Sequence, residues 1–156
     1  MNILFLDYDG VVNTLMWDAE GKKTSFNFPH DNKVNNFQAV QWVSKFCKEK
    51  DYKIVVTSTW RVHENYKECL INGGLWKDVE IIGQTPVSEN RNRELEIKEY
   101  IEEHNIKNFI IVDDENVYNE LESHFIECDM DIGFTFHQYI KCCKFAEKYE
   151  SEGYNE

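Results

Sequence analysis

The sequence predicts an α/β domain in which a mainly parallel sheet of about five strands has helices on both faces. Short apolar runs alternate with amphipathic stretches along the 156 residues, and no repeat, Gly/Ser linker or low-complexity stretch divides the chain. Strands that alternate with helices pair in parallel, because each helix returns the chain to the start of the next strand. A chain of this length forms one domain. We place that domain at residues 1–149, followed by an acidic tail at 150–156.

Five apolar runs are expected to be the strands. Runs of this kind are typical of strands buried inside a sheet. In chain order they cover residues 3–6, 53–57, 79–82, 109–112 and 125–128.

The stretches between these runs are expected to be helical. In the first of them, Val40, Val43 and Cys47 recur at helical spacing, and Asp31 or Asn32 is available as the N-cap. The expected helices cover residues 34–47, 60–70, 93–104, 117–121 and 136–149.

The chain is acidic, with 17 Lys and Arg residues against 29 Asp and Glu residues and a net charge of −12. This charge argues against an extended nucleic-acid footprint, which needs clustered cations. No apolar run is long enough to span a membrane, and Asp7 interrupts the first run too early for a signal peptide. Five cysteines without framework spacing favour reduced thiols, and no zinc-binding spacing is present. We therefore expect a cytoplasmic protein without a membrane partner.

Polar residues gather at the ends of three predicted strands. Asp7 and Asp9 follow the first strand, and hydroxyl residues occupy 57–59 at the end of the second. Asp113 and Asp114 follow the fourth strand. An Asp-x-Asp-Gly segment is also common in turns. Ligands of parallel sheets bind beyond the carboxyl ends of the strands, however, so three such clusters at one edge predict a functional site.

The chemistry of these groups favours phosphoryl transfer. Acids gathered in one crevice repel one another, and Mg²⁺ relieves this repulsion because its preferred ligands are carboxylates, water and a substrate phosphate. One carboxylate can then attack phosphorus and form an aspartyl-phosphate. A second carboxylate two residues on can protonate the leaving oxygen and later activate water. Hydroxyl groups, amides and an Arg or Lys side chain can hold the phosphoryl oxygens.

The order of these motifs resembles that of the haloacid dehalogenase (HAD) superfamily of phosphotransferases. Its first motif matches the apolar strand followed by Asp-Tyr-Asp-Gly at 7–10. Its second matches the strand that ends in Thr-Ser at 57–58, and its fourth matches the strand that ends in paired acids at 113–114. The resemblance implies a Rossmann-like, three-layer α/β/α fold.

Further motifs resemble the small phosphatase domains of RNA-repair proteins, which are similar to the polynucleotide 3′-phosphatases. The shared elements are Ser-Thr-Trp-Arg at 58–61, Thr-Pro at 85–86, Arg93 before Glu-Ile, and Gly-Phe-Thr at 133–135. An Asp-x-Asp-Gly segment alone is a weak signal, whereas this ordered set is specific.

By this resemblance, Asp7 is the nucleophile and a metal ligand. Asp9 is the general acid/base and binds the metal through its backbone carbonyl. Asp113 and Asp114 are the remaining acids of the metal site, and the implied cofactor is Mg²⁺. Glu115 is expected instead to be a solvated charge at a helix start.

The phosphate-binding group is implied at the end of the second strand. Ser58 is the preferred hydroxyl, Thr57 is its alternative, and Thr59 lies beside them. Arg61 either binds substrate phosphate or pairs with a nearby acid. Trp60 is expected to pack in the core rather than to stack on a base.

A basic residue of the third motif completes the implied site. Arg93 fits the Arg-x-x-Glu-Ile pattern, and Arg91 and Lys98 are the alternatives within reach. We also considered His63 as a substrate contact, although an exposed helical position is its expected place.

Neither gap between the motifs holds the cap domain that members of this superfamily often carry. An uncapped crevice is open, and the resemblance then implies large substrates such as nucleic-acid ends or proteins. Residues 14–33 form either a small flap over the site or a plain connecting loop.

Taken together, the sequence predicts a Mg²⁺-dependent phosphomonoesterase whose partner is a phosphorylated substrate, such as a nucleic-acid end. Free nucleotides and other small phosphate esters are the alternative substrates, and a non-catalytic binding module of the same fold is the alternative class. The chain has no GxxxxGK[ST] segment, which argues against a kinase. Val11 stands where phosphoprotein phosphatases of this superfamily have Thr, which argues against that activity. No oligomeric state is predicted.

Overall fold

The sheet consists of five parallel strands in the order β3-β2-β1-β4-β5. The structure is a computed structural model that describes residues 1–15 and 32–152. Its strands are β1 (Asn2–Leu6), β2 (Tyr52–Val56), β3 (Ile81–Gln84), β4 (Asn108–Asp113) and β5 (Phe125–Glu127). The α/β fold with a parallel sheet is confirmed.

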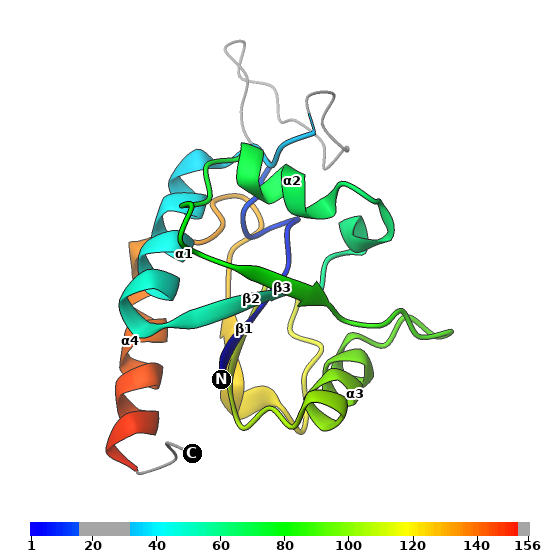
Figure 1. Cartoon of the computed structure of the whole chain (residues 1–156), viewed down its shortest axis with the longest axis vertical. Helices are drawn as coiled ribbons and strands as arrows, with labels where there is room; N and C mark the ends of the chain where they lie inside the picture. The colour runs from blue at the N-terminus through cyan, green and yellow to red at the C-terminus, as the bar shows by residue number, and fades with distance from the viewer. Residues whose placement is uncertain (16–31, 153–156) are drawn as a thin grey trace.

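Helices cover both faces of the sheet and make three layers (Figure 1). Leu4 and Leu6 of β1 belong to a core cluster that α1, α2 and α4 complete, whereas Ile3 and Phe5 belong to a second cluster that α3 completes. The side chains of β1 therefore alternate between two buried faces, which explains why this strand is apolar at successive positions. The helices are α1 (Phe37–Lys50), α2 (Tyr66–Asn72), α3 (Arg93–His104) and α4 (Phe136–Ser151), with short 3₁₀ helices η1 (Thr59–Val62) and η2 (Glu122–His124).

Two helix starts are defined by side-chain caps. Asn36 caps α1 by accepting a hydrogen bond from the amide of Ala39 at 3.0 Å, so α1 begins at Phe37. Asn32, one of the two predicted caps, is therefore not the cap and has a left-handed backbone (φ 53°) before the helix. The other, Asp31, lies outside the described residues. Thr135 caps α4 in a capping box, and α4 continues to Ser151, beyond the predicted end.

The helix predicted over 60–70 is wrong in its extent, because it forms as two separate pieces. The hydroxyl oxygen of Ser58 accepts a hydrogen bond from the amide of Trp60 and starts η1. His63 then adopts an extended backbone (φ −89°, ψ 142°), which ends η1, and α2 starts three residues later at Tyr66.

The helix predicted over 117–121 is also wrong. The carboxylate of Glu94 on α3 accepts hydrogen bonds from the amides of Asn119 and Leu121, at 2.7 and 3.1 Å. Amides held by a side chain from another element are not available for the hydrogen bonds within a helix. The segment therefore forms a loop that leads into η2.

No large cap domain is present in the part of the chain that the structure describes. In this part of the chain, α1 is the one element between β1 and β2, and η1 and α2 lie between β2 and β3. The expected flap or loop at 14–33 lies mostly outside the described residues, since 16–31 are not among them. None of the helices described is long and apolar enough to cross a membrane.

Candidate active site

Asp7 and Asp113 come together because β1 and β4 are neighbouring parallel strands. Leu6 pairs in register with Val112, and the amide of Asp7 donates to the carbonyl of Val112 at 3.1 Å. Both carboxylates consequently extend from the carboxyl ends of their strands into one cavity of about 340 Å³. The side chains that line it belong to Asp7, Asp9, Thr59, Arg93, Asp113, Asp114, Glu115 and Met130.

Asp7, Asp113 and Asp114 form a compact acidic cluster. Their carboxylate oxygens lie within 4.8 Å of one another. Gly10 allows this close approach: its φ is +80°, and a Cβ atom built there would lie 2.3 Å from Cγ of Asp114. Carboxylate oxygens are hard donors, so the chemistry of this cluster fits a hard divalent cation.

Arg93, the first residue of α3, partly neutralises the cluster. Its Nη1 lies 2.8 Å from Oδ2 of Asp113 and 3.4 Å from Oδ1 of Asp7. Of the three basic residues considered from the sequence, Arg93 is therefore the one in the cavity. Lys98 pairs instead with Glu120, and Arg91 is exposed with a left-handed backbone.

The pKa values of the cluster reflect its burial first and its excess of negative charge second. Burial raises the pKa of Asp7 well above its ordinary value, and the charge of Asp113 raises it further, while Arg93 opposes both effects. Burial, together with the hydrogen bond and charge of Asp113, raises the pKa of Asp114 to about 7. Burial disfavours the charged form of Arg93. The negative charges of Asp7 and Asp113 have the larger effect, so the pKa of the guanidinium is raised. A divalent cation would supply the positive charge that one arginine does not.

Asp9 lines the same cavity, and two neighbouring side chains hold its carboxylate. Its Oδ1 accepts a hydrogen bond from Nδ2 of Asn13 at 2.9 Å, and its Oδ2 accepts one from Nε1 of Trp60 at 3.3 Å. Burial raises the pKa of Asp9, and the hydrogen bonds from Asn13 and Trp60 lower it. The hydrogen bonds from Asn13 and Trp60 therefore orient the carboxylate of Asp9 within the cavity.

The end of β2 presents its hydroxyl groups in different environments. The hydroxyl oxygen of Thr57 is buried and has no hydrogen-bond partner in the described structure. Ser58 is buried and caps η1 by accepting a hydrogen bond from the amide of Trp60, and no described group accepts its O–H proton. Thr59 is exposed and lines the cavity.

Arg61 corrects one expectation from the sequence. Its guanidinium is buried and pairs with Glu96 at 3.0 Å. The other hydrogen bonds go to four backbone carbonyls at the ends of β2 and β3, those of Thr57, Ser58, Thr85 and Pro86. These bonds use all five N–H donors of the guanidinium. Arg61 thus has no donor left for a substrate phosphate, and the alternative expectation, an ion pair with an acid, is what forms.

Three residues of this region were missed at the sequence level. Tyr118 donates its hydroxyl proton to Oδ2 of Asp113 at 2.8 Å, in the segment expected to be a helix. Asn13 holds Asp9 from four residues away, a spacing that the tight turn after Asp7 makes possible. Met130 lines the cavity from the loop before α4 and carries no sequence signal. Glu115 also lines the cavity, and no helix starts there.

Comparison with known proteins gives one match. A family model described as the HAD domain in Swiss Army Knife RNA repair proteins matches residues 3–138. This range contains every residue that lines the cavity. No curated protein and no solved structure matches the chain.

Proposed function

Because the chain belongs to the HAD domains of Swiss Army Knife RNA repair proteins, we propose that it is a Mg²⁺-dependent phosphomonoesterase that acts through an aspartyl-phosphate. The observation that carries this proposal is the position of Asp7. Its carboxylate lies within 4.8 Å of those of Asp113 and Asp114 and within 3.4 Å of the guanidinium of Arg93. A carboxylate placed between a cation site and an arginine is suited to attack a phosphoryl group that both would hold.

Asp7 would bind the cation together with Asp113 and Asp114, and the backbone carbonyl of Asp9 is a further proposed ligand. When bound, Mg²⁺ offsets the repulsion between the carboxylates and the phosphate. Arg93 and the hydroxyl of Ser58 are the proposed ligands of the phosphoryl oxygens. Thr59 can add its hydroxyl from the cavity wall, while the Thr57 hydroxyl is buried.

The reaction proceeds in two steps. In the first, a carboxylate oxygen of Asp7 bonds to phosphorus, the bond to the ester oxygen breaks, and Asp9 donates a proton to the leaving oxygen. In the second, Asp9 takes a proton from water, and the water oxygen bonds to phosphorus. The bond between Asp7 and phosphorus then breaks and releases inorganic phosphate. The raised pKa of Asp9 suits the first step, and its hydrogen bonds to Asn13 and Trp60 hold the carboxylate in one orientation.

The proposed substrate is a phosphorylated nucleic-acid end. Support comes from the RNA-repair family description and from the absence of a cap over the crevice in the described residues. The net charge of −12 restricts the contact to the phosphorylated end, where Arg93 and the cation supply local positive potential. The alternative substrates are free nucleotides and other small phosphate esters.

A comparison of kcat/KM values separates the substrate classes. One set of substrates is oligoribonucleotides and oligodeoxyribonucleotides that carry a 3′ or a 5′ phosphate, and the other is the matching mononucleotides. We expect the oligonucleotides to be preferred. A preference for mononucleotides would assign the enzyme to small esters.

The alternative class, a binding module without catalysis, is tested by fluoroberyllate, which mimics a phosphoryl group on a carboxylate. With Mg²⁺ present, we expect wild type to form an adduct at Asp7, detected by ¹⁹F NMR, and the Asp7→Asn variant to form none. Wild type that binds Mg²⁺ but forms no adduct would favour the binding module.

A further inference from the structure

Strand β3 is an edge of the sheet with an open outer side. It is the first strand in the order β3-β2-β1-β4-β5, and its inner side pairs with β2. No hydrogen bond joins its outer side to any residue of the described chain. The strand, Ile-Ile-Gly-Gln, has no charged residue and no proline, which are two devices that commonly block pairing at an edge. Its outer backbone groups therefore have no partner among residues 1–15 and 32–152 and can pair with another strand.

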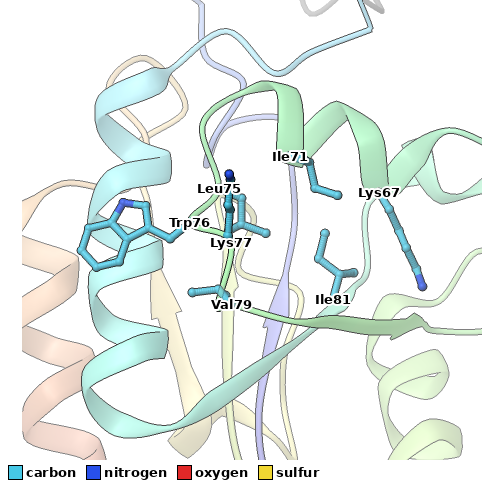
Figure 2. A pocket seen from close by; sticks show the side chains of 7 residues that line it. All are labelled: Lys67, Ile71, Leu75, Trp76, Lys77, Val79 and Ile81. Atoms are coloured by element: carbon cyan, nitrogen blue, oxygen red, sulfur yellow. The ribbon is translucent and has the colours of Figure 1, made fainter.

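A pocket lies on each face of the sheet beside β3. The first, the apolar groove, is lined by Ile71, Leu75, Val79 and Ile81 and has a volume of about 280 Å³. Figure 2 shows Ile71 on α2 and Ile81 on β3 pointing toward one another across this groove. Ile81 packs against the core cluster under α1 and α2. The apolar groove thus opens on the α2 face of the sheet.

The second pocket, the polar pocket, lies on the α3 face. It has a volume of about 320 Å³, and its lining includes Thr85, Tyr100, Glu103 and His104. Ile82 also lines it and packs against the core cluster under α3. The hydroxyl oxygen of Thr85 is buried there without a hydrogen-bond partner in the described structure. Ile81 and Ile82 therefore face different pockets, and the rest of β3 lines the polar pocket.

This arrangement matches the geometry of an extended peptide. Successive side chains of a strand point to opposite faces of its sheet. A strand added beside β3 would place one side chain toward the apolar groove and the next toward the polar pocket. Backbone hydrogen bonds then supply affinity, and the two pockets supply sequence preference.

Charge indicates what kind of peptide fits. Lys67 and Lys77 flank the apolar groove (Figure 2). Neither lysine forms a salt bridge with a described residue. Two ammonium groups beside apolar side chains, without an ion-pair partner among the described residues, favour a ligand with carboxylates on either side of an apolar residue.

We propose that the outer side of β3 is a docking site for an extended acidic peptide segment of a partner protein, which adds to the sheet as a sixth strand. Its apolar side chain enters the apolar groove, and acidic side chains two residues to either side face Lys67 and Lys77. Side chains with hydroxyl groups between them face the polar pocket. This site is separate from the acidic cavity and does not depend on phosphatase activity.

The test uses a defined probe, the blocked peptide Thr-Glu-Thr-Ile-Thr-Glu-Thr, titrated into the ¹⁵N-labelled full chain. We expect amide shift changes confined to β3 and the two pockets. Replacement of both Glu residues of the peptide by Lys should weaken binding at least about tenfold. Replacement of a Thr next to the Ile by Pro should abolish it, because the backbone donor is lost.

Variants of the protein locate the site. Ile71 is 53% exposed, so Ile71→Asp should leave the fold intact while it charges the groove. We expect this variant and the double variant Lys67→Glu/Lys77→Glu each to weaken binding at least about tenfold. The matched control is Lys141→Glu/Lys144→Glu on α4, which changes the net charge equally on exposed residues and should leave binding unchanged.

Three outcomes would overturn the proposal. The peptide fails to bind, or the Lys-substituted peptide binds equally well. Alternatively, sedimentation shows a concentration-dependent dimer that Ile71→Asp abolishes, which would assign this edge to a second copy of the chain.

Discussion

The indole of Trp60 donates a hydrogen bond to Oδ2 of Asp9 at 3.3 Å. The same side chain is buried in the core and contacts Tyr8 edge to face, with ring centroids 5.5 Å apart. Trp60 therefore packs in the core, as expected from the sequence, and it also orients the proposed general acid/base, Asp9. Its neighbour Arg61 joins the segments after β2 and β3 through the carbonyls of Thr57 and Thr85.

Replacement of Trp60 by Phe should keep most of the packing and remove the hydrogen bond. We expect kcat for an aryl phosphate to fall about tenfold, equivalent to about 1.4 kcal/mol, with little change in KM. Because this hydrogen bond lowers the pKa of Asp9, its loss should also move the limb of the pH–rate profile that reports Asp9 to higher pH. If kcat and the pH–rate profile are both unchanged, Trp60 has a packing role and does not orient Asp9.

Removal of Arg61 should destabilise the protein strongly. Arg61→Ala leaves the carboxylate of Glu96 buried without its partner and frees four backbone carbonyls. Breaking a buried pair from one side costs about 3–5 kcal/mol of unfolding free energy. Urea denaturation measures this loss. The matched control is Lys98→Ala, which removes the more exposed pair with Glu120 and should cost less than about 1 kcal/mol. Equal losses for the two variants would show that Arg61 is not a structural clamp.

A side chain at Gly10 should disrupt the acidic cluster. In Gly10→Ala, a Cβ atom would lie 2.3 Å from Cγ of Asp114, in a left-handed conformation that costs about 1–2 kcal/mol for a residue other than Gly. We expect Mg²⁺ affinity, measured by calorimetry, to fall with activity. Gly83→Ala is the control, because its nearest contact, the Tyr100 hydroxyl, lies 3.5 Å away. If the Mg²⁺ affinity of Gly10→Ala equals that of wild type, Asp114 is not a ligand of the metal.

Stability should depend on pH through Asp114. Its pKa in the folded state is about 7, above its ordinary value of 3.8, so the folded protein holds this proton more tightly than the unfolded chain does. The resulting stabilisation is complete below about pH 3.8 and is lost as pH rises through about 7. Without metal, the Tm of Asp114→Asn minus that of wild type should therefore be larger at pH 8 than at pH 5. Mg²⁺ should reduce this increase.

Calorimetric scans at these two pH values, with and without Mg²⁺, measure the effect. A difference between wild type and Asp114→Asn that does not change with pH would show that burial and Asp113 do not raise the pKa of Asp114 in the folded state.

The sequence predicted much of the site, because the positions of Asp7 and Asp113 follow from strand ends in a parallel sheet. Each strand was recognisable as a local apolar run, and parallel neighbours align their carboxyl ends without further information. Arg93 was indicated by its motif, with Arg91 and Lys98 as alternatives, and the structure places Arg93 in the cavity.

The remaining errors come from contacts that are distant in sequence. Whether Arg61 binds a ligand or pairs internally depends on Glu96, 35 residues away on α3. The segment at 117–121 has helical periodicity, but Glu94 takes two of its amides. Such choices depend on which elements meet in space, and the local pattern of residues does not contain that information.

The most direct test of the proposed function is the initial rate of p-nitrophenyl phosphate hydrolysis with saturating Mg²⁺, compared between wild type and Asp7→Asn. Amide nitrogen and oxygen do not replace the attacking carboxylate, so we expect the rate to fall at least about a thousandfold. Circular dichroism should show that the variant is folded, because Asn conserves the volume of the buried side chain. Equal rates for the two folded proteins would contradict the role of Asp7 as the nucleophile.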